Sequence, residues 1–178
     1  MKIRPANTED LPFIVRTELV DEGTTPGYRD EWTENEFAEH RELMLSFVVS
    51  PDKGARVVEE GTELIGMILW RYRNRFTEDI PASSVFCQID SSTYSLDGAF
   101  CEIFNLWVDP RFRRRGLGTE LKISAEEDAV ARGVKLVYTH TEETNPHVLE
   151  LNKKLGYVEV RRGPIWDEVV RVSLVKTL

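Results

Sequence analysis

The apolar and polar positions of the 178-residue chain form a succession of strand and helix patterns. Alternating or continuous apolar stretches predict strands at residues 2–5, 56–60, 63–73, 100–108, 135–141, 157–162 and 169–176. Helical stretches that begin at capping residues are predicted at about residues 7–20, 34–47, 116–132 and 145–155. The strand at Phe100–Val108 has apolar residues on both faces, as a central strand should. This order of elements indicates an α/β protein.

Local signals mark the ends of several of these elements. Asn7–Asp10 supplies a cap and an acidic first turn for the first helix, and Asn145 is the expected N-cap of the last helix, before Pro146. Residues 21–32 are rich in turn formers and are predicted to be a loop, whereas residues 74–98 are expected to be a long loop or an added short strand. Because we find no repeat, low-complexity tract or linker, we expect residues 1–178 to form a single domain.

Composition narrows the function classes. The chain is 41% hydrophobic and 30% charged, as globular proteins are, and its formal net charge is −8. Such an acidic chain is a poor match for nonspecific binding to nucleic acid or to anionic membranes, and it suits a cationic substrate. The longest apolar run, residues 64–70, is far shorter than the ~20 residues of a membrane helix, and the first ten residues do not resemble a secretory signal. We therefore expect a cytoplasmic protein without membrane contact.

A basic stretch, VDPRFRRRGLGTEL at Val108–Leu121, is unusual in this acidic chain. Its arginines lie where a strand is predicted to end and a helix to begin near Gly116. The first turn of a helix has unpaired N–H groups and the positive end of the helix dipole, and glycines there let a ligand approach the backbone. We interpret the stretch as a phosphate or pyrophosphate site, with a solvated surface run and a nucleic-acid contact as alternatives. Its glycine spacing matches neither the P-loop nor the dinucleotide-binding fingerprint.

The pattern that does match is V-x-P-x-x-R-x-x-G-x-G, filled by Val108, Pro110, Arg113, Gly116 and Gly118. It resembles the coenzyme A pyrophosphate loop of the GNAT superfamily of N-acetyltransferases. The stretches IRPANTEDL and NPHVLELNKKLGYVEV are similar to the opening of that family and to its last helix with the following strand. The order of predicted elements is also that of the family. The resemblance implies a GNAT fold, with a central mixed sheet of about seven strands flanked by about four helices.

The resemblance also implies where acetyl-coenzyme A binds. The pantetheine arm would lie along the backbone of residues 106–108, one N–H of which would face the thioester oxygen, and the N–H groups of residues 114–119 would hold the pyrophosphate. Family members use the asparagine at the position of Asn145 against the pantetheine arm. The residues expected to bind acetyl-coenzyme A are Leu106, Trp107, Val108, Arg113, Arg114, Arg115, Gly116, Leu117, Gly118, Thr119, Asn145 and Asn152. Dimers are frequent in the family, so a homodimer is a further expectation.

Glu102 is the expected general base. Strand alternation places it on one face with large apolar residues, namely Phe100, Phe104, Leu106 and Val108. Apolar surroundings raise the pKa of a carboxyl group and suit it to accept a proton near neutral pH. A catalytic glutamate has the same spacing in the histone-acetyltransferase branch of the family. The alternatives are a glutamate paired with a neighbouring lysine or arginine, and a strand bulge that turns the side chain elsewhere.

Asn152 departs from the family pattern. Many relatives have a tyrosine there that protonates or hydrogen-bonds the departing thiolate, and an amide cannot be that acid. A thiol of pKa about 8.5 can leave unassisted or through water. Tyr138, Tyr157 and His140 are candidate substitutes, each with a packing or capping role as its alternative.

Other residues receive simpler interpretations. His40 and His147 are expected at the surface, and alternation turns Cys101 away from Glu102. Two cysteines are too few for a disulfide framework, and no cluster of histidines, cysteines and carboxylates indicates a metal. We expect the walls of an acceptor pocket to come from residues 162–168 and from residues 20–32, where a cation could be received by Asp21, Glu22, Tyr28 and Trp32.

The sequence therefore predicts an N-acetyltransferase that moves an acetyl group from acetyl-coenzyme A to a primary amine. The amine of a small molecule or peptide would attack directly in a ternary complex, without a covalent enzyme intermediate. The rival hypothesis is a non-catalytic acyl-coenzyme A sensor or interaction domain that keeps the loop. Nucleic-acid binding through Arg111–Arg115 is a weaker third hypothesis, and no feature of the sequence identifies the acceptor.

Overall fold

The computed structural model describes residues 1–21, 32–77 and 84–178, with only the backbone of Asp21. Two compact units are formed. The first unit comprises residues 1–70 and 105–121, and the second unit comprises residues 71–104 and 122–178.

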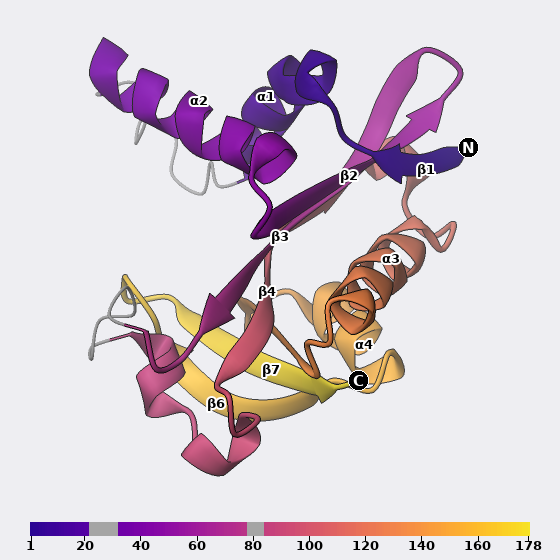
Figure 1. Ribbon diagram of the computed structural model, residues 1–178. Coiled ribbons are helices and arrows are strands. Elements are labelled where there is room, and N and C mark those ends of the chain that lie inside the picture. The colour runs from indigo at the N-terminus through magenta and orange to yellow at the C-terminus, as the bar shows by residue number, and fades with distance from the viewer. Residues whose placement is uncertain (22–31, 78–83) are drawn as a thin grey trace. The chain divides into compact units, whose positions relative to one another are not determined.

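The described residues follow the predicted order of elements (Figure 1). The strands are β1 (Lys2–Pro5), β2 (Lys53–Glu60), β3 (Glu63–Asn74), β4 (Ala99–Val108), β5 (Leu136–Glu142), β6 (Val158–Pro164) and β7 (Val170–Thr177). The α-helices are α1 (Leu11–Asp21), α2 (Glu34–Val49), α3 (Leu117–Ala131) and α4 (Pro146–Lys154). The strands form one sheet of seven in the order β1-β2-β3-β4-β5-β7-β6. Because β4 pairs parallel to β5 while β7 pairs antiparallel to β5 and β6, the sheet is mixed, which confirms the predicted fold class.

In the first unit, α1 and α2 pack against each other, and α2 also packs on β2 (Figure 1). Fully buried apolar side chains of this unit include Ile14, Met44, Phe47, Val57, Val58, Ile65, Met67, Ile68 and Leu69. Asn7 caps the short 3₁₀ turn that leads into α1, and Thr33 caps α2, so the start of each helix has the polar partner that its free N–H groups need.

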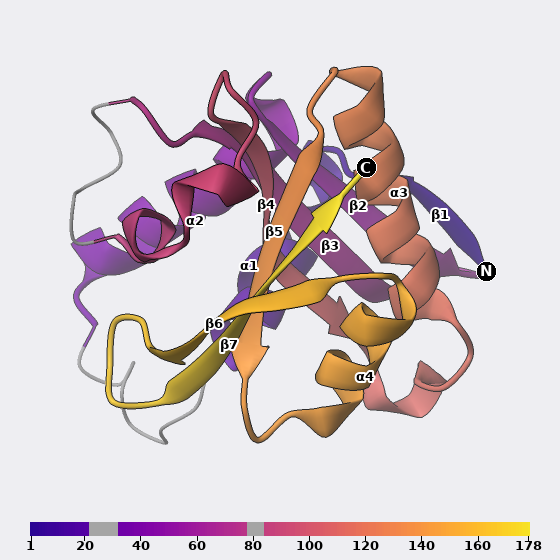
Figure 2. The same ribbon diagram turned by 90° about the horizontal axis from the view of Figure 1, so that it is seen from below.

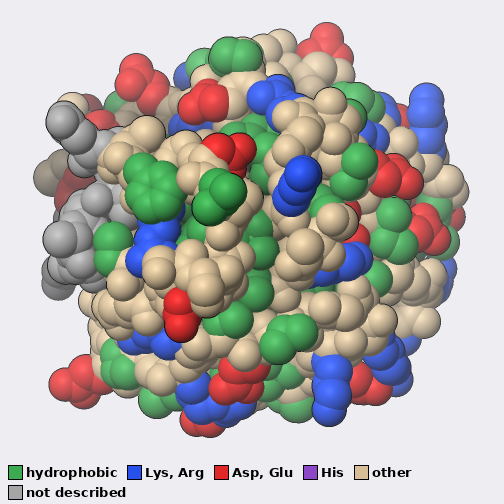
Figure 3. All heavy atoms as spheres, turned by 60° about the horizontal axis from the view of Figure 1, so that its bottom comes forward, with side chains coloured by type: hydrophobic (Ala, Val, Ile, Leu, Met, Phe, Trp, Pro, Cys, Tyr) green, Lys and Arg blue, Asp and Glu red, His purple; other side chains and the backbone are tan. Residues whose placement is uncertain are grey.

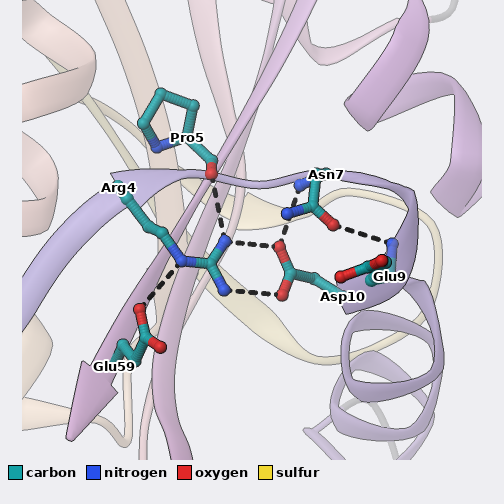
Figure 4. Close-up of polar contacts among 6 residues, drawn as sticks. All are labelled: Arg4, Pro5, Asn7, Glu9, Asp10 and Glu59. Atoms are coloured by element: carbon teal, nitrogen blue, oxygen red, sulfur yellow. Dashed lines mark hydrogen bonds and ion pairs between the residues drawn. The ribbon is translucent and has the colours of Figure 1, made fainter.

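A buried ion pair joins β1 to the start of α1 (Figure 4). Arg4 donates to both carboxylate oxygens of Asp10, at 2.7 and 2.9 Å, and its Nε donates to Glu59 at 3.0 Å. Asp10 is only 4% exposed and also accepts the backbone N–H of Asn7 at 2.8 Å. The hydrogen bond from Arg4 is the main cause that lowers the pKa of Asp10, so this carboxylate is ionised at neutral pH.

His40 does not lie at the surface as predicted. Its Nε2 lies 3.0 Å from a carboxylate oxygen of Glu18, and the two side chains are 8% and 2% exposed. The prediction was wrong because the packing of α2 against α1 turns this position inward. His147 is exposed, as expected.

The core of the second unit is built from strands and from the segment before β4 (Figure 2). Residues 84–98 contain two 3₁₀ turns, η2 (Val85–Gln88) and η3 (Ser91–Thr93), so the described part of the segment matches the predicted loop and not the alternative strand. The core cluster consists of Val85, Phe86, Ile89, Tyr94, Phe100, Leu136, Tyr138 and Val175. The segment is therefore held by its own apolar residues, although it has no regular strand.

None of the helices in the described residues is long and apolar enough to cross a membrane. Within the same residues, no group of three or more histidine, cysteine, aspartate or glutamate side chains is arranged to hold a metal ion.

Replacement of Asp10 by asparagine should lower the free energy of unfolding at pH 7 by about 1–3 kcal/mol, because the half-buried Arg4 loses its charged partner. Glu59→Gln, which removes the more exposed partner of the same arginine, should cost less than about 1 kcal/mol. The pKa of Asp10 is lower in the folded state, so the effect of Asp10→Asn should disappear as the pH falls below the ordinary aspartate value of 3.8 and through the folded-state pKa. Urea unfolding of both variants from pH 7 to pH 3 measures this, and equal losses in the two variants would contradict the prediction.

Candidate functional site

The parallel pairing of β4 with β5 is short. Among the described residues, the recorded pairs are Cys101 with Val137 and Glu102 with Tyr138, although both strands continue within the second unit. On its other edge, β5 is paired with β7 along its whole length. Glu102 therefore lies where the ladder between β4 and β5 ends.

Glu102 is buried, with 4% of its surface exposed, and it is held by two arginines of β3. Arg71 donates from Nε and Nη2 to the two carboxylate oxygens, at 2.6 and 3.1 Å, and Arg73 donates at 3.4 Å. The expected apolar surroundings are thus wrong, and the alternative of a paired glutamate is found. Alternation along one strand shows which face a side chain takes, but it does not show what the neighbouring strand contributes. Both carboxylate oxygens of Glu102 therefore accept hydrogen bonds from guanidinium groups.

His140 lies on β5, two residues beyond the partner of Glu102. Its ring meets the edge of Trp166, with 5.1 Å between ring centroids, and its buried Nδ1 has no hydrogen-bond partner in the part of the chain that the structure describes. Burial lowers the pKa of His140 to about 4, against the opposing effect of the Glu102 charge. The imidazole is therefore neutral at pH 7 and can exchange a proton with a ligand or with water.

The end of β4, in the first unit, comes close to β3. Leu106, Trp107 and Val108 are each half-buried, and the Trp107 ring packs edge-on against Phe13 with centroids 6.0 Å apart. A Cβ atom on Gly66 would lie 3.2 Å from the Trp107 carbonyl oxygen, so the glycine permits this close approach.

The turn after β4 uses part of the arginine run for its own support. Asp109 accepts hydrogen bonds from the backbone and side chain of Arg111, which also pairs with Glu63. Arg113 donates from Nε to the Val108 carbonyl at 2.9 Å. Arg111 is therefore committed to the carboxylates of Asp109 and Glu63, which the sequence pattern did not reveal.

The glycine loop then enters α3 with a backbone that suits an anion. Arg114 and Gly116 have φ values of 65° and 86°, in the left-handed region that favours glycine. The side chains of residues 113–115 are exposed, and α3 begins directly after Gly116, whose carbonyl accepts the N–H of Glu120. The N–H groups at the start of α3 precede the first bond of this kind, so they are available to a ligand. Loop, glycines and arginines together fit a diphosphate.

The predicted residues of α4 lie in the second unit. The side chain of Asn145 accepts the N–H of Val148 at 3.3 Å, which confirms its capping role. Asn152 is completely buried, its Oδ1 accepts a hydrogen bond from Lys122, and its Nδ2 has no partner among the described residues. The amide is thus fixed by a lysine that sequence reasoning had overlooked.

Lys122 is 1% exposed, and its Nζ lies 4.1 Å from the centre of the Tyr157 ring. Burial lowers the pKa of Lys122 to about 7, while the charge of Glu126 acts in the opposite direction. The signal in the sequence was the position of this lysine, directly after Leu121 and three residues before Ala125. Both of these apolar residues are buried in the structure.

The two tyrosines considered as acids have structural partners. The Tyr138 hydroxyl lies 3.1 Å from the hydroxyl of Ser173, and Tyr157 donates to Glu126 at 2.9 Å. Burial raises the pKa of both phenols, so both stay protonated, and the alternative of a structural role is favoured for each. Burial likewise raises the pKa of the Cys101 thiol, which is therefore no activated nucleophile.

The expected acceptor walls are described in part. The side chain of Asp21, together with Glu22 and Tyr28, lies outside the described residues, and Trp32 packs against Phe37 with ring centroids 5.3 Å apart. In the segment 162–168, Trp166 is 63% exposed, and the Arg171 guanidinium lies 4.1 Å over its ring.

The distribution of charge bears on the nucleic-acid hypothesis. On the face drawn in Figure 3, lysine and arginine side chains are interspersed with aspartate and glutamate side chains. A nucleic-acid site usually gathers basic residues over a face, so this face lacks that signature.

The comparisons with known proteins agree with the fold. The model of the acetyltransferase (GNAT) family matches residues 18–157, and the chain belongs to this family. An uncharacterized N-acetyltransferase of Methanocaldococcus jannaschii is 37% identical over 70 residues, which are 39% of this chain and 31% of that relative.

Solved structures share the whole fold at low identity. Arabidopsis thaliana NAA60 in complex with acetyl-CoA has a TM-score of 0.70 at 21% identity, over 99% of this chain and 98% of the other. A ribosomal-protein-alanine N-acetyltransferase from Brucella melitensis has a TM-score of 0.69 at 18% identity, over 100% of both chains.

Lys122→Met should alter how stability depends on pH. Between pH 7 and 9 an unfolded lysine is protonated and the folded Lys122 is largely not, so the free energy of unfolding of the native protein should rise with pH, by at most about 1.4 kcal/mol per pH unit. The variant should lose this rise, whereas Lys154→Met, at an exposed lysine of α4, should keep it. Urea unfolding at pH 7, 8 and 9 tests this, and equal slopes in all three proteins would show that Lys122 is charged when folded.

Proposed function

We propose that this chain is an N-acetyltransferase that moves the acetyl group of acetyl-coenzyme A to a primary amine by direct attack in a ternary complex. The observation that carries the proposal is the path of β4, which bears Glu102 at the end of its ladder with β5 and then runs directly into the glycine loop before α3. Membership of the family supports the same reaction.

The donor would be held by backbone groups as well as by side chains. The N–H groups of residues 114–119 and the exposed guanidinium groups of Arg113, Arg114 and Arg115 would hold the pyrophosphate. The backbone of residues 106–108 would receive the pantetheine arm, and an N–H there would stabilise the oxyanion by ~3 kcal/mol. Asn145 and Asn152 are the proposed contacts on α4. Acetyl-coenzyme A supplies the thioester, whose acetyl group is activated for transfer.

An alkylammonium has no lone pair, so a group in the second unit has to take its proton. Glu102 is the base that we propose, and Arg71 would have to yield one carboxylate oxygen to the proton or to a bridging water. His140 is a second candidate, favoured by the buried Nδ1 that has no partner and by its neutral state at pH 7.

Departure of the thiolate needs no strong acid. Tyr157 already donates to Glu126, and Asn152 is fixed by Lys122, so neither is arranged as a proton donor to the sulfur. A coenzyme A thiol with a pKa near that of cysteine, about 8.5, is a good leaving group and can be protonated by water.

The acceptor would be the amine of a small molecule or peptide, as the names of similar proteins suggest for those proteins. The single domain, the homodimer and the cytoplasmic location remain predictions from the sequence.

Gly118→Glu should abolish the binding of coenzyme A, because it places a side chain and a negative charge at the start of α3. In the native protein, ligand at 100 times its Kd should stabilise the fold by ~2.7 kcal/mol. Val130→Glu adds the same charge at an exposed position near the other end of α3 and should keep the shift. Thermal unfolding with and without coenzyme A measures this, and a native protein without a shift would refute the donor site. Binding without release of free thiol in a panel of amines would favour the sensor hypothesis.

Glu102→Gln should lower kcat by ~10²–10⁴ and flatten the acidic limb of the pH–rate profile, with the affinity for acetyl-coenzyme A nearly unchanged. Higher pH should partly rescue the variant by supplying neutral amine. His140→Gln is the matched test of the second candidate. A lower melting temperature of Glu102→Gln with an unchanged kcat would show that the glutamate serves only to hold Arg71 and Arg73. If only His140→Gln flattens the acidic limb of the pH–rate profile, the imidazole is the group that takes the proton of the amine.

A further inference from the structure

Three arginines follow one another at alternate positions in the second unit, each against an aromatic ring. The guanidinium carbon of Arg71 lies 5.2 Å from the centre of the Phe104 ring, that of Arg73 lies 5.1 Å from Phe86, and that of Arg75 lies 4.7 Å from Tyr94. Arg71 and Arg73 belong to β3, and Arg75 extends the same line because its N–H donates to the Gly98 carbonyl at 2.9 Å. Side chains two residues apart take the same face of a strand, so the three form a row.

A fourth guanidinium, that of Arg161 on β6, also reaches η2, the turn that contains Phe86. It donates to Gln88 at 2.8 Å and to the carbonyls of Gly163 and Pro164 at 3.1 and 2.6 Å, all of which are uncharged acceptors. We call Arg71, Arg73, Arg75 and Arg161 the arginine cluster.

The charge of the arginine cluster is poorly balanced. Among the described residues, Glu102 is the carboxylate that pairs with it, through Arg71 and Arg73. Asp90 feels the charge of Arg75, but its carboxylate is engaged by the backbone and hydroxyl of Ser92. A local excess of cations is unexpected in a chain of net charge −8, in which carboxylates are plentiful.

Two donors of the cluster also lack acceptors. Nε of Arg73 and Nη1 of Arg75 are buried atoms that have no hydrogen-bond partner within residues 1–21, 32–77 and 84–178. Cation–π contact stabilises a guanidinium but does not satisfy an N–H directed elsewhere, and a buried donor without an acceptor is unfavourable. The side chains of Arg71 and Arg73 are nevertheless 26% and 15% exposed, so both are partly accessible to solvent.

We propose that the arginine cluster binds a carboxylate of the acceptor, so that the substrate is an amine that also carries an acidic group. This inference rests on the proposed function. The planar guanidinium fork matches a carboxylate in geometry and charge. The ligand is the acceptor and not the donor because the cluster shares Glu102, the group proposed to take the acceptor's proton. Nearby cations also disfavour an ammonium, so the cluster would promote the neutral, attacking form of the amine while the carboxylate secures binding.

Matched pairs of acceptors test the proposal. The first pair is a dipeptide amide with N-terminal aspartate and the same dipeptide amide with N-terminal asparagine. The second pair is β-alanine and β-alaninamide. The first pair tests a peptide as the source of the carboxylate, and the second pair tests a small molecule. Release of free thiol gives kcat/KM for each. In the native protein the acid of at least one pair should exceed its amide by about 10- to 100-fold, the range of a charge-assisted hydrogen bond. Arg75→Gln and Arg161→Gln should each bring this ratio toward one, and a general loss of activity cancels in the ratio.

Arg162→Gln is the matched control, because Arg162 is the next residue along β6 and pairs instead with Glu143 and Glu159. It should leave the ratio unchanged. Equal rates for acid and amide in both pairs would overturn the proposal, and so would a preference for the acid that survives both cluster variants.

Binding of succinate, which has no amine, separates this inference from the proposed function. Succinate should shift the arginine side-chain NMR signals of the native protein with coenzyme A bound, succinamide should not, and Arg75→Gln should weaken the response at least about tenfold. If coenzyme A binds but no amine is acetylated, the proposed activity fails. The succinate titration still decides whether the arginine cluster binds a carboxylate. No response to succinate, or an equal response in Arg75→Gln, would overturn the anion site.

Discussion

The early end of the parallel ladder between β4 and β5 is the constraint on which the candidate site depends. β5 is fully committed to β7 on one edge, yet on the other edge its recorded partners are two residues of β4. Backbone N–H and C=O groups beyond that point need acceptors and donors from elsewhere, because a buried peptide group without a partner is unfavourable. Glu102 and His140 belong to the two strands whose recorded pairing ends here.

Burial of charge is the second recurring feature of the molecule. Asp10, Glu18, Glu102 and Glu126 are all buried, and each has a partner far away in the sequence or across a packed helix pair. Removing one member of such a pair is unfavourable because it leaves a charge without its partner in a poorly hydrated place. These pairs therefore constrain how the elements of each unit pack, and they reduce the choice of side chains at the positions involved.

The elements were predictable because their signals are local. The caps at Asn7 and Asn145 and the apolar pattern of Phe100–Val108 appear within a few residues of the chain, and the structure has the expected elements there. The surroundings of Glu102 were not predictable, since Arg71 precedes it by 31 residues and its approach depends on the pairing of strands. Lys122 was missed for the same reason, because its partner Asn152 is on another helix, 30 residues away.

The contact between Lys122 and Asn152 has a consequence for how this chain can evolve. A single change of Asn152 to the tyrosine of many relatives would remove the carbonyl that accepts the bond from Lys122, inside a site with no exposed surface at Asn152. A single change of Lys122 to an apolar residue would instead leave an asparagine amide without a partner. Each substitution is tolerable mainly after the other, so the two positions form an epistatic pair.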